Sequence, residues 1–372
     1  MLKKKLNKKH ILLTGGHAGS TAYALIRQIK VQNKPWELSW IGPKKAMEGR
    51  NTGFLEQDIF PGLGIDSYTI DSGRIQRKFS RWTIPSILKI PKGFLQAIYL
   101  VRRIKPDLIL SFGGFSAFPV VVASWLYKIP VLVHEQTACA GRANIYSAFF
   151  AKKILVSRDS SKKYFPKNKI ILTGNPIEPE ILKIKFKPKI SDPPVIFVTG
   201  GHTGSVILND SIEKILKELL KSNYVIHQTG DLQYKKFSEL RGKLAESLQN
   251  RYLVYATIKP VHWPNILERA DILISRAGAN IVSQVLVIKR PAIFIPLPFA
   301  YLNEQNANAL FAKDFGIAEI IDQEDLTENI LLTKINKITR SWENIVRKVK
   351  EKKSPDENSS FYVVDMVDKL LH

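Results

Sequence analysis

Two nearly identical heptapeptides decide the fold of this chain, Thr14-Gly15-Gly16-His17-Ala18-Gly19-Ser20 and Thr199-Gly200-Gly201-His202-Thr203-Gly204-Ser205. Each follows a short apolar run, residues 11–13 and 195–198, and precedes a stretch with helical spacing. A strand, a glycine turn and a helix in this order direct backbone N–H groups and a helix N-terminus toward a ligand, and they favour phosphate. The same turn also forms where glycine only supplies a positive φ and serine caps the helix, so both interpretations stay open.

Apolar runs and helical stretches alternate in both halves of the chain, which is typical of parallel sheets covered by helices. In the first half the expected strands are residues 11–14, 37–41, 66–70, 108–112, 131–134, 154–156 and 170–173, with helices at 21–31 and 84–104. In the second half they are residues 195–198, 224–227, 253–255, 272–275, 292–295 and 318–321. Gly174-Asn175-Pro176 and the Lys- and Pro-rich residues 186–194 indicate a linker. We expect a Rossmann-like domain over residues 1–185, a second one over 190–350, and a helix at 359–372 that packs back on the body.

The composition points to an anionic partner. The 372 residues carry a formal net charge of +23, which suits nucleic acid or an anionic membrane surface. No helix-turn-helix, zinc-finger or RNP-type signature is present, so nucleic acid is not expected. The single cysteine, Cys139, excludes an internal disulfide and favours a reducing cytoplasm. No signal peptide is expected, because the apolar run 11–13 after the basic residues 1–9 is broken at once by Gly15-Gly16. No transmembrane helix is expected either, because the uncharged stretch 108–127 suits a strand, a loop and a helix.

Residues 74–105 mix cations with large apolar side chains and contain no acidic residue. Such a mixture is typical of a surface that dips into the interface of an anionic membrane. The expected membrane patch consists of Arg77, Phe79, Arg81, Trp82, Ile87, Leu88 and Phe94. A core helix with a solvated basic face is the alternative. Pro85 and Pro91 are expected to bound the helical portion.

Candidate site residues follow the expected strands, at the sheet edge where ligands bind in such folds. His134-Glu135 offers a base and its orienting partner, of which one is expected to reach the site. Ser275-Arg276-Ala277-Gly278-Ala279-Asn280 opens a helix that a diphosphate can approach, and the amides of residues 303–308 suit sugar hydroxyls or a capped helix start. The glycine spacing departs from G-x-G-x-x-G, which argues against a nicotinamide dinucleotide. No D-x-D, H-E-x-x-H or Walker A sequence is present, so no metal site is expected.

The chain resembles the MurG family in a series of motifs that covers nearly its whole length. These are the two glycine loops, Lys105-Pro106-Asp107 before Phe112-Gly113-Gly114-Phe115, Ile129-Pro130-Val131 before His134-Glu135-Gln136, Gly174-Asn175-Pro176, Arg276-Ala277-Gly278-Ala279 and Gln305-Asn306-Ala307-Asn308-Ala309. The resemblance implies an α/β fold of the GT-B type, with two Rossmann-like domains whose parallel sheets face a central cleft.

The resemblance also implies an activity and a location. The family moves N-acetylglucosamine from UDP-N-acetylglucosamine (UDP-GlcNAc) to undecaprenyl-linked lipid I, with inversion and without a metal or another cofactor, and the product is lipid II for peptidoglycan synthesis. Because peptidoglycan forms the cell wall, the resemblance further implies a role in cell shape and cell division. The expected place is the cytoplasmic face of the cell membrane, as a peripheral protein, where other cell-wall enzymes are further expected partners.

Individual residues receive roles from the same resemblance. The catalytic candidates are His17, Ser20 and Glu135, with His17 or Glu135 as the base. The candidates for binding the donor UDP-GlcNAc are Gly16, His17, Ala18, Thr137, His202, Ala279, Asn280, Ile281, Val282, Ser283, Gln284 and Gln305. The acceptor-binding candidates are Gly15, Gly19, Gly113, Gly114, His134 and Asn144.

Several of these positions depart from the family pattern. Ser20 stands where the first loop of the family has a histidine, and His17 stands where it has a threonine. Thr137 replaces an asparagine, Gln284 replaces the glutamate that holds the ribose, and His202 replaces a serine. Serine is a poor base without a partner. Alternatives therefore stay open: a related GT-B enzyme that acts on another lipid, a UDP-sugar epimerase, or a non-catalytic homologue that binds UDP-sugar or lipid.

Overall fold

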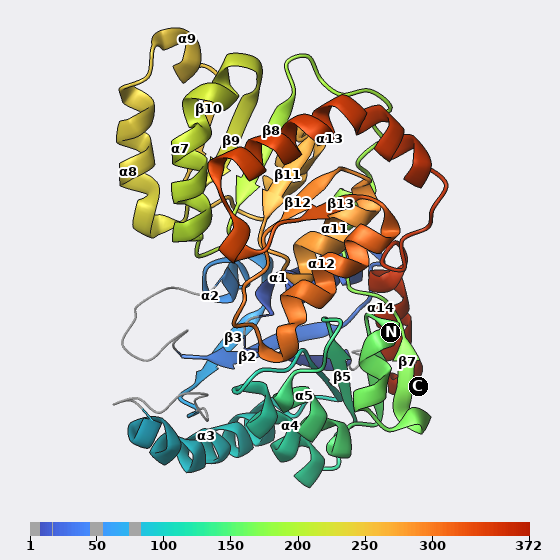
Figure 1. Cartoon of the computed structure of the whole chain (residues 1–372). Coiled ribbons are helices and arrows are strands. Elements are labelled where there is room, and N and C mark those ends of the chain that lie inside the picture. The colour runs from blue at the N-terminus through green and yellow to red at the C-terminus, as the bar shows by residue number, and fades with distance from the viewer. Residues whose placement is uncertain (1–7, 17, 45–54, 74–82) are drawn as a thin grey trace, which may run out of the picture. The chain divides into compact units, whose positions relative to one another are not determined.

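The computed structural model describes residues 8–16, 18–44, 55–73 and 83–372, and it divides the chain into two compact units (Figure 1). Unit 1 comprises Met1–Pro179 and Asn358–His372, and unit 2 comprises Glu180–Glu357. Each unit has its own parallel sheet, so the two parallel α/β domains predicted from the sequence are confirmed. The division falls somewhat earlier in the chain than the expected boundary.

The sheet of unit 1 has, among the described residues, the strand order β3-β2-β1-β4-β5-β6-β7, and all its pairings are parallel. The strands are β1 (His10–Thr14), β2 (Glu37–Pro43), β3 (Asp66–Ile70), β4 (Leu108–Ser111), β5 (Val131–Glu135), β6 (Lys153–Val156) and β7 (Ile170–Leu172). The expected strands are confirmed, with ends that shift by at most two residues. Chain order reverses between β1 and β4, and at such a point a crevice opens beyond the carboxyl ends of the strands.

Helices cover both faces of this sheet. They are α1 (Gly19–Val31), α2 (Leu55–Ile59), α3 (Thr83–Ile104), α4 (Ala117–Leu126), α5 (Arg142–Phe150) and α14 (Ser359–Leu371). Helices α1 and α14 pack on the face that contains Ile11 and Leu13, whereas α3, α4 and α5 pack on the face that contains Leu12. This alternation along β1 is the pleat of a strand that is buried on both sides. The C-terminal helix thus completes unit 1 after the chain has built all of unit 2 (Figure 1).

Helix α3 corrects one expectation about the prolines. Pro91 lies inside the helix and does not bound it, so that prediction is wrong. Pro91 has no N–H for the carbonyl of Ile87, which removes one intrahelical hydrogen bond. Ala97, Leu100 and Val101 are buried in the core and hold the second half of α3 on the sheet. Tertiary packing of this face outweighs the lost bond.

The uncharged stretch 108–127 forms β4, a loop and α4, as predicted. In the part of the chain that the structure describes, no helix combines the length and the apolar character needed to cross a membrane.

The sheet of unit 2 has the order β10-β9-β8-β11-β12-β13 and is also parallel. Its strands are β8 (Val195–Thr199), β9 (Tyr224–Gln228), β10 (Tyr252–Tyr255), β11 (Ile272–Ser275), β12 (Ala292–Phe294) and β13 (Ala318–Ile320). Its helices are α7 (Val206–Ser222), α8 (Asp231–Gly242), α9 (Glu246–Gln249), α10 (Trp263–Arg269), α11 (Ala279–Ile288), α12 (Glu304–Phe315) and α13 (Glu328–Val349), while α6 (Pro179–Leu182) lies at the division between the units. Chain order reverses here between β8 and β11.

Helix α13 shows how the sequence of unit 2 specifies its packing. The side chain of Thr327 accepts a hydrogen bond from the N–H of Ile330 and caps the helix. The buried residues recur at helical spacing and form one apolar stripe: Leu331, Ile335, Ile338, Trp342, Val346 and Val349. This stripe shares a core with α7 and with the inward residues of β8 and β11.

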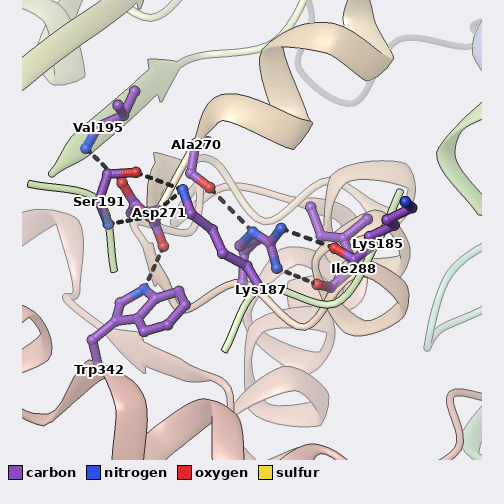
Figure 2. Close-up of polar contacts among 9 residues, drawn as sticks. Lys185, Lys187, Ser191, Val195, Ala270, Asp271, Ile288 and Trp342 are labelled. Carbon is purple, nitrogen blue, oxygen red and sulfur yellow. Dashed lines mark hydrogen bonds and ion pairs between the residues drawn. The ribbon is translucent and has the colours of Figure 1, made fainter. Parts of the chain in front are cut away.

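A network of buried polar groups holds the segment before β8 on unit 2 (Figure 2). The carboxylate of Asp271 is fully buried, pairs with Lys187 Nζ at 2.6 Å and accepts the N–H groups of Ser191 and Val195 at 3.2 and 2.8 Å. The Arg290 guanidinium donates to three carbonyl oxygens, those of Ala270, Ile288 and Lys185. Burial lowers the pKa of Arg290 to about 10, so it stays charged at neutral pH. The linker predicted from the composition is therefore bound to unit 2 along much of its length.

Candidate functional site

The glycine loop of unit 1 needs glycine for close packing. A Cβ on Gly16 would lie 2.9 Å from the Cα of Gly114, and one on Gly114 would lie 2.6 Å from the Cα of Gly16. The N–H of Gly16 also donates to the carbonyl of Gly113 at 2.8 Å. The loops after β1 and β4 therefore touch through their backbones at the reversal point of the sheet. Gly113 and Gly114 have positive φ, whereas none of the described glycines of the first heptapeptide does. The interpretation that this loop needs positive φ is wrong.

The loop after β5 is organised around Glu135. Its carboxylate accepts hydrogen bonds from the N–H and hydroxyl of Thr137, the N–H of Gly141 and the side-chain amide of Asn144, at 2.8 to 3.1 Å. Burial raises the pKa of Glu135, against these four donors, which lower it. Asn144 donates to the carbonyl of His134 as well, and its amide lies against Gly113. Five of the predicted site residues are thus brought together in contacts that shape the loop: Gly113, His134, Glu135, Thr137 and Asn144.

The predicted catalytic and acceptor residues of unit 1 differ in exposure. Ser20 is exposed in the first turn of α1, and it does not cap the helix, because Ala18 occupies that position. His134 is fully buried, where its Nε2–H donates to the carbonyl of Gly174 and its ring packs on Phe112. Glu135 is buried too, so neither of the two side chains is exposed. Gly15, Gly16, Ala18 and Gly19 are buried, and His17 lies outside the described residues.

Glu56 is a site neighbour that the motifs did not indicate. It is 3% exposed, and the N–H of Gly19 at the start of α1 donates to its carboxylate. A Cβ on Gly19 would lie 2.7 Å from the Glu56 Cδ, so this contact requires glycine. Burial raises the pKa of Glu56 to about 7. Glu56 belongs to no recognisable motif, and only the fold brings it to the glycine loop.

The raised pKa of Glu56 predicts a pH dependence of stability. The folded chain keeps the proton until about pH 7, while the unfolded chain releases it near pH 4.3. Stability therefore falls as the pH rises between these values, and the loss is complete above pH 7. We expect the difference in the free energy of unfolding between Glu56→Gln and wild type to shift by about 2 to 4 kcal/mol in favour of the variant from pH 5 to pH 8. Urea unfolding at the two pH values measures this shift. Asp58→Asn, exposed on the same helix, is the control; an equal difference between Glu56→Gln and wild type at both pH values would contradict the prediction.

The glycine loop of unit 2 is built differently. Gly201 and Gly204 have φ of 85° and 73°, and Ser205 caps α7 by accepting the N–H of Leu208, so the turn interpretation is confirmed for this copy. Gln228, which the motifs did not indicate, donates to the carbonyl of Gly201 at 2.8 Å. A Cβ on Gly204 would lie 2.1 Å from the carbonyl oxygen of Thr229. The end of β9 thus holds the loop, and His202 at its tip is exposed.

Arg276 joins the strand ends of unit 2. Its Nε donates to Ser205 Oγ at 3.1 Å, Nη1 to the carbonyls of Ile295 and Pro296, and Nη2 to Gln323 Oε1 at 2.8 Å. The residue is 6% exposed, and none of the described carboxylates forms an ion pair with it. Burial lowers the pKa of Arg276, yet an arginine keeps its charge at neutral pH. A buried cation with neutral partners, next to the N-termini of α7 and α11, favours a bound anion.

The predicted donor-binding residues on α11 differ in burial along the helix. Ala279, Asn280 and Ile281 are half-buried at the helix N-terminus. Val282 and Ser283 are buried, and the Val282 N–H donates to the Gly278 carbonyl. Gln284 is 4% exposed, and its Oε1 accepts the indole N–H of Trp263.

Gln305 lies at the start of α12, where its Oε1 accepts the N–H of Leu297. It therefore fixes the loop after β12 beside the carbonyls that Arg276 binds. Asn303, offered as a helix cap, occupies the cap position in the left-handed region without a capping hydrogen bond from its side chain. Within the described ranges, no three His, Cys, Asp or Glu side chains gather as metal ligands would.

The membrane patch is described in part. Arg77, Phe79, Arg81 and Trp82 lie outside the described residues. Ile87 and Leu88 are 45% and 72% exposed on α3, as expected for such a patch. Phe94 is half-buried, because its ring packs against Phe118 of α4.

Comparison with known proteins first gives the class. The glycosyltransferase family 28 N-terminal domain matches residues 11–156, and the glycosyltransferase family 28 C-terminal domain matches residues 195–362. The first range runs from β1 to β6, and the second spans all six strands of the sheet of unit 2. The chain is a glycosyltransferase with two parallel α/β domains.

Individual relatives narrow the class to one family. The chain is 34% identical over 347 residues to the UDP-N-acetylglucosamine–N-acetylmuramyl-(pentapeptide) pyrophosphoryl-undecaprenol N-acetylglucosamine transferase 2 of Bacillus cereus, covering 90% of this chain and 93% of the relative. It is 31% identical to the corresponding transferase of Clostridium kluyveri, over 97% and 99% of the two chains. The crystal structure of Acinetobacter baumannii MurG matches with a TM-score of 0.69 and 27% identity, over 97% and 99%. The chain belongs to the MurG family.

Proposed function

We propose that this chain transfers N-acetylglucosamine from UDP-GlcNAc to the muramoyl-pentapeptide of undecaprenyl-pyrophosphate-linked lipid I and so produces lipid II for peptidoglycan. Relatives that match 90% and 97% of this chain carry this activity in their names. The observation that carries the proposal in this chain is Arg276, a buried cation bound only to neutral groups among the described residues, where two helix N-termini meet. A nucleoside diphosphate supplies the missing negative charge.

The proposed reaction is a single displacement with inversion. A hydroxyl of the acceptor attacks the anomeric carbon of the donor sugar, and the bond from that carbon to the UDP oxygen breaks. The acceptor proton passes to a base, and UDP leaves with the electron pair. Arg276 and the N-termini of α7 and α11 stabilise the charge that grows on the leaving diphosphate.

The base is proposed to be His17 or Glu135. The contacts of Glu135 weigh against it, because its carboxylate is 3% exposed and already accepts four hydrogen bonds from its own loop. A base must reach the proton that it removes. The variants His17→Ala and Glu135→Gln separate the two candidates. The variant that lacks the base should lose most of its kcat, and its pH profile of kcat should lose the acidic limb.

The proposal includes transfer without a metal. The positive charge that a metal would bring to the diphosphate comes from Arg276 and the helix N-termini. The rate should therefore be the same with excess EDTA and with added magnesium. A loss of activity in EDTA that magnesium restores would overturn this part of the proposal.

Helix α3 is proposed to seat the protein on the cytoplasmic face of the cell membrane. Ile84, Leu88, Leu95 and Tyr99 recur on one face of α3 and are 61% to 72% exposed. Cations flank them, and the net charge of +23 attracts an anionic surface. Large exposed apolar side chains also fit poorly with a core helix that has a solvated basic face.

The double variant Leu88→Glu, Leu95→Glu should bind vesicles of phosphatidylglycerol about tenfold less tightly, or weaker still, because two apolar anchors are lost and two like charges are added. Sedimentation with the vesicles measures this binding. Leu232→Glu, on unit 2 at a residue 80% exposed, is the control and should bind as wild type does. Equal binding by all three proteins would contradict the role of α3.

Two rival functions are tested by the same substrates. A GT-B enzyme for another lipid would glycosylate diacylglycerol in preference to a lipid I analogue. Ser20, in place of the family histidine, favours a non-catalytic homologue, which would bind UDP-GlcNAc in calorimetry without turnover. We expect turnover with the lipid I analogue and UDP-GlcNAc, and little with diacylglycerol or other UDP-sugars.

A further inference from the structure

Trp263 makes a contact in unit 2 that no sequence motif indicates. It is the first residue of α10, and its indole Nε1–H donates to Gln284 Oε1 at 2.9 Å. The indole also packs edge-on against Phe197 of β8, with ring centroids 5.3 Å apart and an interplanar angle of 73°. Phe197 is fully buried in the sheet. The core of unit 2 thus sets the position of the indole, and the indole nitrogen points at Gln284.

The chemistry of this bond fixes the orientation of the Gln284 amide. An indole N–H is a donor only, so it selects the amide oxygen and turns the NH₂ group to the other side. Glutamate at the same position would offer only acceptors when ionised. Gln284 is on α11, the helix whose N-terminus lies beside Arg276. Its amide orientation therefore affects how a ligand at this helix is bound.

We propose that Trp263 is a positioning residue of the UDP-sugar site, which holds the Gln284 amide in the orientation that binds the donor. The inference rests on the proposed function, because it takes Gln284 as a donor-binding residue. Trp263 acts through Gln284 and is not itself a catalytic residue. Gln284 carries no charge, and the indole N–H of Trp263 fixes the orientation of its amide.

A double-mutant cycle tests this coupling. Trp263→Phe keeps a ring on Phe197 and removes the N–H, and Gln284→Met removes the acceptor at similar size. Calorimetry with UDP-GlcNAc should show a Kd about five- to tenfold higher for Trp263→Phe, and KM should rise equally while kcat stays within about twofold. In the Gln284→Met background, Trp263→Phe should change Kd by less than about twofold. Trp263→His, whose ring N–H can donate, should recover part of the affinity.

The outcomes separate this inference from the proposed function. An unchanged Kd for Trp263→Phe, or an equal loss in both backgrounds, overturns the positioning role while donor binding stands. If wild type binds no UDP-GlcNAc, the proposed function is overturned and the inference with it. Thermal unfolding of each variant shows whether it is folded, and Trp263→Leu, which also lacks the N–H, supplies the cycle if Trp263→Phe is not folded.

Discussion

Arg276→Met should lower kcat/KM for UDP-GlcNAc by about 100- to 1,000-fold, because the leaving diphosphate loses the cation that faces it in a buried site. The guanidinium bonds only to a hydroxyl, two carbonyls and a side-chain amide, so no described carboxylate already neutralises it. Steady-state kinetics with a lipid I analogue measures the loss. UDP should raise the melting temperature of wild type and leave that of the variant unchanged.

Two further substitutions make this result specific. Arg276→Lys keeps the positive charge but loses the planar set of guanidinium donors. Its kcat/KM should therefore lie between those of wild type and Arg276→Met. Arg269→Met removes an exposed arginine from α10 of the same unit and should leave kcat/KM as in wild type. If Arg276→Met keeps its activity within about threefold of wild type, the diphosphate is not bound at this junction.

Asp271→Ala should lower the free energy of unfolding of unit 2 by about 3 kcal/mol. The carboxylate is fully buried, and its removal leaves the N–H groups of Ser191 and Val195 without their acceptor and Lys187 without its ion-pair partner (Figure 2). Urea unfolding measures the loss, and amide exchange at residues 191 and 195 should accelerate with it.

Lys187→Met is the matched control for the same network. The lysine is 23% exposed, and the two N–H groups continue to serve the carboxylate, so we expect a smaller loss of stability than in Asp271→Ala. A loss below about 1 kcal/mol in Asp271→Ala would show that water replaces the carboxylate at no great cost. The linker would then be bound to unit 2 more loosely than the contacts indicate.

The strands and helices were largely predictable, because buried strands of a parallel sheet are short apolar runs and their helices carry apolar stripes. Val195 to Val198 and the spaced apolar residues of α13 are examples of these two patterns. Pro91 was misjudged because local propensity ends a helix there, while burial of Ala97 and Val101 keeps it on the sheet.

The site was less predictable than the fold. The two heptapeptides look alike, yet one loop needs glycine for the close approach of Gly16 to Gly114, and the other needs it for positive φ at Gly201 and Gly204. Gln228 and Trp263 support the second half of the site from a strand and a helix that are distant in the sequence. Contacts of this kind depend on the packing of the sheet, and no spacing of residues along the chain encodes them.

The most direct test of the proposed function is transfer of labelled N-acetylglucosamine from UDP-GlcNAc to a lipid I analogue by the purified wild-type chain. We predict one labelled lipid product, formed with one UDP released for each sugar transferred and with inverted anomeric configuration. No labelled lipid with any UDP-sugar, under conditions in which the chain is folded, would contradict the account.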